Sequence, residues 1–242
     1  MIRLCVLGNS HVGALKRAAD EVCLQNPDLR LGFFAARSNQ TRDMTIRDGR
    51  YCPTAPALAD QLALTSGGQR DIDPAQWDAF LIYGFGGRRR QGDTPRRFSK
   101  ALRQTVALER IRNSLLPAHA RALRSLSDAP IFAALAPLAA QTGDKPALRL
   151  LPPRVESALV QAEICTALGV TLVPQPEASL AGKTATRRDF SRNAAMLEQA
   201  DRKPQIDPQE HRHMNAAYGK LWLTEFLVQL RRALADDMAR KA

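Results

Sequence analysis

Cysteine and aromatic residues are scarce in this chain of 242 residues. Its four cysteines, at positions 5, 23, 52 and 165, include no Cys-x-x-Cys pair. Zinc-binding and thiol-redox motifs therefore have no support, and a reduced, cytoplasmic setting is expected. Aromatic residues make up only 5% of the chain, so the core has to be built from Ala, Leu, Val and Ile.

Long apolar runs are also missing. No run approaches the roughly 20 residues that cross a bilayer, so the sequence predicts no membrane span. The N-terminus enters a strand-like segment at once and lacks the layout of a secretion signal. Neither an internal repeat nor an interdomain linker is visible, and residues 1–242 are expected to form one domain.

The charge, by contrast, is strongly basic, with a formal net charge of +11 and a pI near 10.2. The arginines are spread along the chain, apart from a cluster formed by Arg88-Arg89-Arg90 and Arg96-Arg97. No aromatic ladder for stacking bases accompanies this cluster, which disfavours nucleic acid as a partner. The pattern favours a solvated Arg-rich surface, and binding of an anionic polymer by the Arg88–Arg97 loop is kept as an alternative.

Strand-like and helix-like segments alternate along the chain, which predicts an α/β fold with a parallel sheet. Residues 37–75 are rich in Arg, Asp, Thr, Gly and Pro and are expected to be largely irregular, although residues 57–64 fit either a short helix or a strand. We therefore predict a three-layer α/β/α, flavodoxin-like, doubly wound sheet. The predicted strands are 2–7, 29–35, 78–83, 130–138 and 170–174; the predicted helices are 12–23, 96–127 with a break near Pro117, 155–168 and 216–238.

The Gly8-Asn9-Ser10-His11 turn follows the first predicted strand. Sites of open parallel sheets form beyond the carboxyl ends of the strands, and N–H groups at a helix start can stabilise an oxyanion. Ser10 is therefore a candidate nucleophile, and a helix N-cap is its alternative role. For His11 the choice lies between local packing or hydrogen bonding and a substrate contact.

A second polar segment precedes the last predicted helix. It carries His213 with an acid, Glu210, three residues upstream. Such a pair can act as an oriented general base, whereas the alternative is a solvated pair at a helix start capped by Asn215. Asp207 is an alternative acid, and His211 could replace His213. His119 has no partner by spacing and is interpreted as structural.

Together these segments resemble the SGNH, or GDSL-type, hydrolase superfamily. Its members have a flavodoxin-like fold, a nucleophilic Ser in a Gly-Asp-Ser turn after the first strand, and an Asp-x-x-His motif before the last helix. Gly8-Asn9-Ser10 matches the first motif with Asn for Asp, and Glu210-x-x-His213 matches the second with Glu for Asp. The resemblance spans the whole chain, and the run from His213 to Gly219 implies a small, Gly-containing turn into the last helix.

The oxyanion elements depart from this family pattern. The family places an Asn donor in a Gly-x-Asn-Asp segment, whereas this chain has Gly84-Phe85-Gly86-Gly87, with Gly86 at the Asn position. Loss of one such donor costs about 2.7–4 kcal/mol of transition-state stabilisation. The second family donor, a Gly, corresponds to Gly68, Gly67 or Gly49.

The resemblance implies a serine-dependent esterase, acyl-ester hydrolase or acyltransferase, with a small ester or an acylated sugar as substrate. Ser10 would attack, His213 would take its proton, and Glu210 or Asp207 would orient His213. Asn9, Gly84, Gly86, Gly68 and His11 are the candidate oxyanion and substrate contacts. A Ser/His pair needs no metal or cofactor, and none is expected. A catalytically impaired domain that binds a glycan or serves polysaccharide biosynthesis is the alternative, and the sequence does not fix the oligomeric state.

Overall fold

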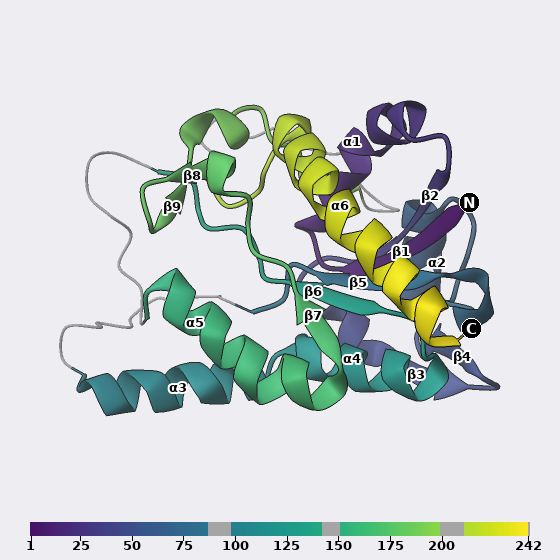
Figure 1. The fold of residues 1–242 in the computed structure, drawn as a ribbon, viewed down its shortest axis with the longest axis horizontal. Helices are drawn as coiled ribbons and strands as arrows, with labels where there is room; N and C mark the ends of the chain where they lie inside the picture. Colours follow the sequence, from purple (N-terminus) through teal and green to yellow (C-terminus); the bar gives the residue numbers. More distant parts are fainter. Residues whose placement is uncertain (87–97, 142–150, 199–210, 242) are drawn as a thin grey trace.

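A five-stranded parallel sheet forms the centre of the computed structural model, which describes residues 1–86, 98–141, 151–198 and 211–241. The strand order is β2-β1-β5-β6-β7 (Figure 1). Counting only these strands, this is the 2-1-3-4-5 order of flavodoxin-like folds. The bounds are β1 Ile2–Gly8, β2 Leu29–Ala35, β5 Ala79–Tyr83, β6 Ile131–Ala134 and β7 Val170–Leu172.

Helices cover both faces of the sheet, so the predicted three-layer α/β/α architecture is confirmed. On one face lie α1 (Val12–Gln25) and α6 (Ala216–Lys241). On the other lie α2 (Pro56–Ser66), α3 (Lys100–Arg112), α4 (Leu115–Leu126) and α5 (Pro153–Val160). In Figure 1, α1 is seen above the sheet, α6 runs diagonally from the top across the strands to the lower right, and α3, α4 and α5 lie below the sheet.

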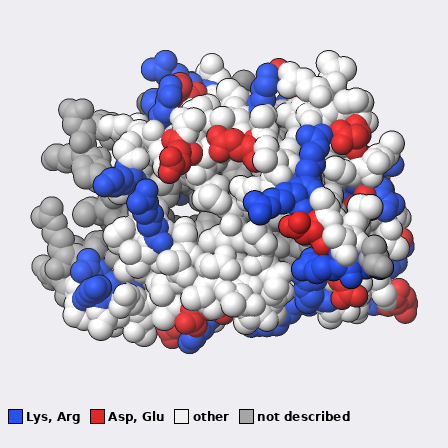
Figure 2. All heavy atoms as spheres, in the orientation of Figure 1, with Lys and Arg blue, Asp and Glu red and all other residues white. Residues whose placement is uncertain are grey.

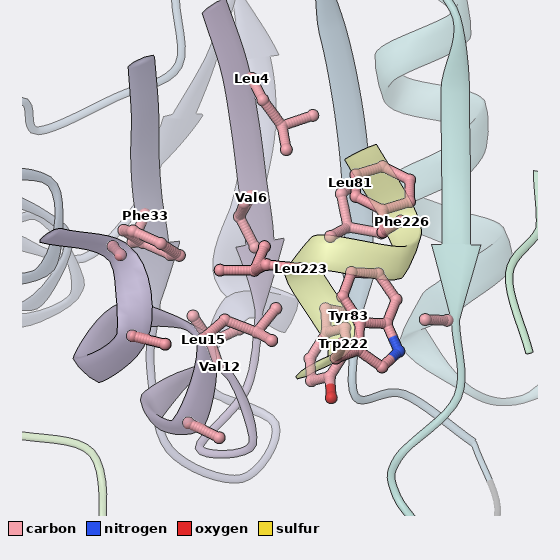
Figure 3. Close-up of a cluster of buried hydrophobic side chains, with 14 of the residues drawn as sticks. Leu4, Val6, Val12, Leu15, Phe33, Leu81, Tyr83, Trp222, Leu223 and Phe226 are labelled. Atoms are coloured by element: carbon pink, nitrogen blue, oxygen red, sulfur yellow. The ribbon is translucent and has the colours of Figure 1, made fainter. Parts of the chain in front are cut away.

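Two hydrophobic clusters, one on each face, hold the layers together. The cluster under α1 and α6 is drawn in Figure 3, where Leu4 and Val6 of β1 face Leu223 and Phe226 of α6. Phe226 packs edge to face on Phe132 of β6, with ring centroids 5.0 Å apart. Alternate side chains of the central strands enter opposite clusters, which explains why these strands read as continuous apolar runs.

The contact between α1 and α6 depends on a glycine. A Cβ placed on Gly219 would lie 2.0 Å from the Ala14 carbonyl oxygen, so only glycine permits this approach. Gly219 lies inside α6, and the expectation of a Gly-containing turn before the last helix was therefore wrong. The residue brings the first and last helices of the described chain into contact.

Three predicted segments differ from the structure. The break predicted near Pro117 falls at Asn113 and Ser114, because a proline in the first turn of α4 has no hydrogen bond to lose. The strand predicted over 130–138 is limited to β6. The helix predicted over 155–168 consists of α5, a π-helical turn (Gln161–Cys165) and a 3₁₀ turn (Thr166–Leu168).

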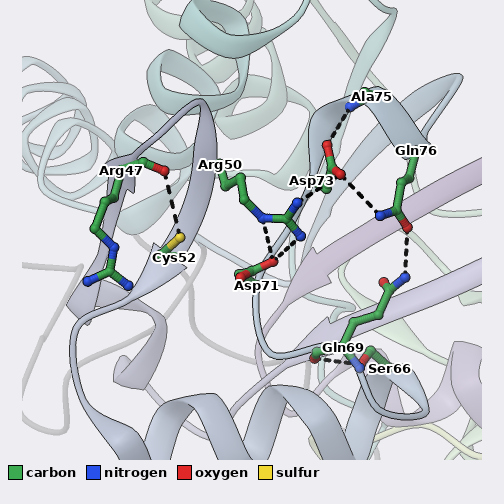
Figure 4. A network of polar contacts seen from close by, with 9 residues as sticks. All are labelled: Arg47, Arg50, Cys52, Ser66, Gln69, Asp71, Asp73, Ala75 and Gln76. Atoms are coloured by element: carbon green, nitrogen blue, oxygen red, sulfur yellow. Dashed lines mark hydrogen bonds and ion pairs between the residues drawn. The ribbon is translucent and has the colours of Figure 1, made fainter.

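Two short hairpins were not predicted. The first joins β3 (Met44–Arg47) to β4 (Arg50–Pro53) within the segment expected to be irregular. Arg50 anchors it through ion pairs to Asp71, at 2.5 Å, and Asp73, at 2.8 Å (Figure 4). The second hairpin joins β8 (Leu180–Ala181) to β9 (Ala185–Thr186).

Charged side chains of both signs are interspersed on the face shown in Figure 2. The arginine cluster at 88–97 lies outside the described residues, so its role stays a prediction. Among the helices in the described ranges, none is both long enough and apolar enough to cross a membrane.

Candidate active site

Ser10 lies in the turn between β1 and α1, at the carboxyl edge of the sheet. The turn is closed by the N–H groups of Val12 and Gly13, which donate to the carbonyls of Asn9 and Ser10. His11 occupies the N-cap position of α1, and no side chain caps the helix there. The Ser10 hydroxyl is thus not used as a cap.

The Ser10 hydroxyl instead meets a histidine from the other end of the chain. Ser10 Oγ and His213 Nε2 lie 2.9 Å apart, although the residues are separated by 203 positions. This is the hydrogen-bond distance expected between a nucleophile and its general base. The structure therefore brings together the two residues that the sequence singled out as nucleophile and base.

The backbone beside His213 is held from two directions. From α1, Arg17 Nη2 donates to the Met214 carbonyl at 3.1 Å. Next to it, the Asn215 N–H donates to the Phe190 carbonyl, and Asn215 Oδ1 accepts from the N–H of Tyr218. Asn215 is therefore the N-cap of α6. The cap was foreseen in the sequence, whereas Arg17 carries no local pattern that marks its contact.

His211 has a different role from His213. Its backbone carbonyl accepts the N–H of Ala140 at 2.6 Å, which ties this segment to the chain that follows β6. Ser10 Oγ is bonded to His213, so the structure favours His213 as the base. Glu210 and Asp207, the two candidate acids, lie outside the described residues, and the choice between them stays a prediction.

Asn9 joins two turns of the site. Its Nδ2 donates to the Gly84 carbonyl at 2.7 Å, and its Oδ1 accepts the His11 N–H at 3.0 Å. Gly84 has a φ of +91°, and a Cβ there would lie 2.5 Å from Asn9 Oδ1. The amide of Asn9 thus fixes the turn after β1 to the turn after β5. An aspartate would place a second acceptor against the Gly84 carbonyl, which explains why Asn is present.

The candidate oxyanion donors differ in whether their N–H groups already donate hydrogen bonds within the fold. The Gly84 N–H donates to the Ala134 carbonyl and is engaged in the sheet. Gly68 closes α2 by donating to the Ala63 carbonyl, and no hydrogen bond among the described residues links it to Ser10 or His213. None of the hydrogen bonds between described residues uses the N–H of Ser10 or of Gly86.

His11 lies against His213. Their rings are stacked, with centroids 5.0 Å apart and planes inclined by 28°. The ring of His11 thereby limits the orientations open to the base. A contact of His11 with substrate stays a prediction.

His119 is enclosed beneath the turn after β5. Its Nδ1 lies 2.8 Å from Tyr51 Oη and its Nε2 lies 3.1 Å from Thr41 Oγ1. The Phe85 ring packs on it with centroids 5.0 Å apart. Burial lowers the pKa of His119 to about 3, so this imidazole is neutral at physiological pH. The prediction of a structural residue fits this setting, but its partners come from the segment that the sequence left unassigned.

Comparisons with known proteins give only distant likenesses. The periplasmic domain of a lipopolysaccharide acetyltransferase from Salmonella ser. Paratyphi A aligns with a TM-score of 0.49 and 9% identity, over 94% of this chain and 83% of that one. A gut microbial diltiazem-metabolizing enzyme aligns with a TM-score of 0.42 and 12% identity, over 78% of this chain and 43% of that one. No family description and no curated protein matches the sequence.

Within the described ranges, no group of three or more His, Cys, Asp or Glu side chains is arranged to hold a metal ion.

Proposed function

We propose that this protein is a serine-dependent acyl-ester hydrolase or acyltransferase of SGNH type. The observation that carries the proposal is the 2.9 Å distance between Ser10 Oγ and His213 Nε2 at the carboxyl edge of the sheet. Two residues 203 positions apart, each within a motif of the sequence, lie there at the distance that a nucleophile and its base require. The substrate class is a small ester or an acylated sugar.

The reaction follows from the two side chains. Ser10 Oγ attacks the ester carbonyl while its proton passes to His213 Nε2, and a tetrahedral intermediate forms. Collapse of the intermediate breaks the bond to the alcohol, which leaves with the proton from His213. Water, or an acceptor alcohol in a transferase, then attacks the acyl-Ser10 ester. His213 accepts the attacking group's proton and returns a proton to Ser10 Oγ.

Backbone groups would stabilise the oxyanion. The N–H of Ser10 and the N–H of Gly86 are the donors proposed here, because hydrogen bonds within the described fold leave both available. Gly86 offers no side-chain amide, so the site has one donor fewer than the family pattern. We therefore expect a slower acylation step, by the ~10²–10³-fold that one oxyanion donor contributes.

Labelling with a fluorophosphonate probe tests the proposal. The folded wild-type protein is expected to be modified at Ser10, as located by peptide mass spectrometry. Ser10→Ala and His213→Ala should each abolish labelling. Ser125→Ala, a substitution on the exposed surface of α4, is the matched control and should label normally. Wild-type protein that stays unlabelled while folded would overturn the proposal.

A second candidate function is a catalytically impaired domain of the same type that binds a glycan. The absence of a side chain at Gly86 favours it, because an oxyanion site with weak donors binds without turning over. Isothermal titration with acetylated and deacetylated oligosaccharides distinguishes the two. Binding without release of acetate supports this candidate, whereas acetate release that depends on Ser10 supports the enzyme.

A further inference from the structure

A cavity of about 610 Å³ lies beside α6, near the carboxyl ends of β6 and β7. Its volume falls in the range of small-molecule sites. Neither Ser10 nor His213 lines it, so it is not accounted for by the nucleophile and base. The start of α5 and the β8 hairpin form its outer walls.

The cavity is elongated along α6. Tyr218, Trp222, Phe226 and Gln229 line it at intervals of four, four and three residues, which places them on one stripe of the helix. With a rise of 1.5 Å per residue, the stripe from Tyr218 to Gln229 is about 16 Å long. The space is therefore a trough that follows three turns of α6.

The inner wall of the trough is apolar, whereas most of its charges lie outside. Leu135 and Leu172 line it together with Trp222 and Phe226. Four of the five charged lining residues are exposed to solvent and carry both signs: Arg154, Glu177, Lys183 and Glu225. The fifth, Glu156, is half-buried at the start of α5. A charged group deep in the trough would lose its hydration without a partner. The buried part of a ligand is thus uncharged and apolar.

One end of the trough adjoins the candidate active site. Ala134 lines the trough, and its carbonyl accepts the N–H of Gly84. The Gly84 carbonyl in turn accepts the amide of Asn9, the residue before Ser10. Tyr218 also lines the trough, in the first turn of the helix that follows His213. Two successive hydrogen bonds, through Gly84, therefore connect Ala134 of the trough to the turn that carries Ser10.

We propose that the trough holds the apolar chain of the ester whose carbonyl reacts at Ser10. This assignment rests on the proposed function and narrows its substrate class from short acetyl esters to esters with a chain of about ten to twelve carbons. An extended alkyl chain advances by ~1.3 Å per carbon, so a chain of this length fills a trough of ~16 Å. The chain belongs either to the acyl group or to the alcohol, and both have the same apolar chemistry.

A chain-length series tests the assignment. In p-nitrophenyl alkanoates from acetate to dodecanoate the chain belongs to the acyl group, and in alkyl acetates of the same chain lengths it belongs to the alcohol. One of the two series is expected to show kcat/KM rising with each added methylene by up to about fourfold, the factor equivalent to ~0.8 kcal/mol per buried CH₂. Flat profiles in both series would overturn the assignment.

Adjacent residues on α6 supply a matched pair of variants. Gln229 lines the far end of the trough, whereas Val228 is 70% exposed and does not line it. Gln229→Trp should lower kcat/KM for the longest esters by at least ten times the factor by which it lowers kcat/KM for the acetate. Val228→Trp should change neither. On α5, Ser157→Trp and Ala158→Trp repeat the comparison, because only Ser157 lines the trough. Equal effects within both pairs would overturn the assignment.

Failure of this assignment is distinguishable from failure of the proposed function. If Ser10 is labelled but kcat/KM does not depend on chain length, the trough does not bind the substrate chain, whereas the proposed esterase function still holds. No labelling and no hydrolysis overturn the proposed function and this assignment together. Analytical sedimentation tests a third outcome, in which the trough is an interface between two copies of the chain. A dimer that is dissociated by Gln229→Trp but not by Val228→Trp would show this and overturn the assignment.

Discussion

Two histidines of this protein contact hydroxyl groups at similar distances but in opposite surroundings. His213 is partly exposed at the sheet edge, where its Nε2 lies 2.9 Å from Ser10 Oγ. His119 is 1% exposed, and its two ring nitrogens lie 2.8 and 3.1 Å from the hydroxyls of Tyr51 and Thr41. The hydroxyl–imidazole pair alone therefore does not identify a catalytic centre.

What separates the two pairs is access and position. The Ser10 turn lies beyond the carboxyl end of β1, where ligands bind in open α/β sheets. Thr41 and Tyr51 enclose His119 on both sides, so neither hydroxyl can reach a substrate. Burial also removes the proton affinity that a general base requires, since the pKa of His119 falls to about 3. We expect one histidine to serve chemistry and the other stability.

The largest expected difference is in rate. Ser10→Ala and His213→Ala should each lower kcat for the best ester by ~10⁴-fold or more, because nucleophile and base act as a unit. Thr41→Val removes a hydroxyl from the buried pair and should leave kcat within about twofold. Steady-state assays of the purified variants measure this contrast. Full activity of Ser10→Ala would show that the pair at the sheet edge is not catalytic.

Stability should show the reverse order. His119→Phe leaves the hydroxyls of Tyr51 and Thr41 without their partner and should lower the free energy of unfolding by about 2–4 kcal/mol. His213→Ala should lower it by less than ~1 kcal/mol, as is usual for a residue outside the core. Urea denaturation monitored by circular dichroism provides both values. Equal losses would remove the distinction between the two histidines.

Asn9→Asp tests how closely the Ser10 turn depends on its neighbour. The substitution restores the residue typical of Gly-Asp-Ser motifs, but it puts a carboxylate oxygen where Nδ2 now donates to the Gly84 carbonyl. We expect a loss of ~2 kcal/mol in stability and a lower kcat. Asn39→Asp, in an exposed position whose side chain makes no cap hydrogen bond, is the control. A stabilised and faster Asn9→Asp enzyme would contradict the positioning role of Asn9.

The smallest expected effect is a change in how the free energy of unfolding depends on pH. Because burial lowers the pKa of His119 to about 3, the unfolded chain binds a proton below pH ~6.5 that the folded chain does not bind. Stability contributed by neutral His119 is therefore lost as pH falls, at up to about 1.4 kcal/mol per pH unit between ~6 and ~3. His119→Gln should lack this component while keeping the contribution of the carboxylates. Identical slopes for the two proteins, from urea denaturation at pH 7, 6 and 5, would contradict the assignment.

The sequence predicted the features that leave a local pattern. The central strands appear as apolar runs, and Ser10 and His213 appear in motifs at a strand end and before a helix. The β3–β4 hairpin was missed because β3 is mostly exposed and shows no burial alternation. Asp48-Gly49, with φ values of 52° and 73°, is a hairpin-turn signal that could have revealed it.

The partners of His119 left no comparable signal. Thr41 and Tyr51 precede it by 78 and 68 residues, and only the fold brings them together. The trough along α6 was likewise invisible, because its wall is built from residues that read as ordinary core. The single-domain organisation of residues 1–242, the cytoplasmic setting and the triad acid stay predictions.

The α1–α6 contact at Gly219 also bears on how activity is acquired during folding. Ser10, the proposed nucleophile, is synthesised near the beginning of this sequence and His213, the proposed base, near its end. The contact between them is among the most non-local contacts of the described fold. Closing a loop of this length has a high entropic cost and tends to come late in folding. The reactivity of Ser10 would thus appear only once α6 has docked and brought His213 into place. A chain whose sheet had formed without that helix would not react at Ser10.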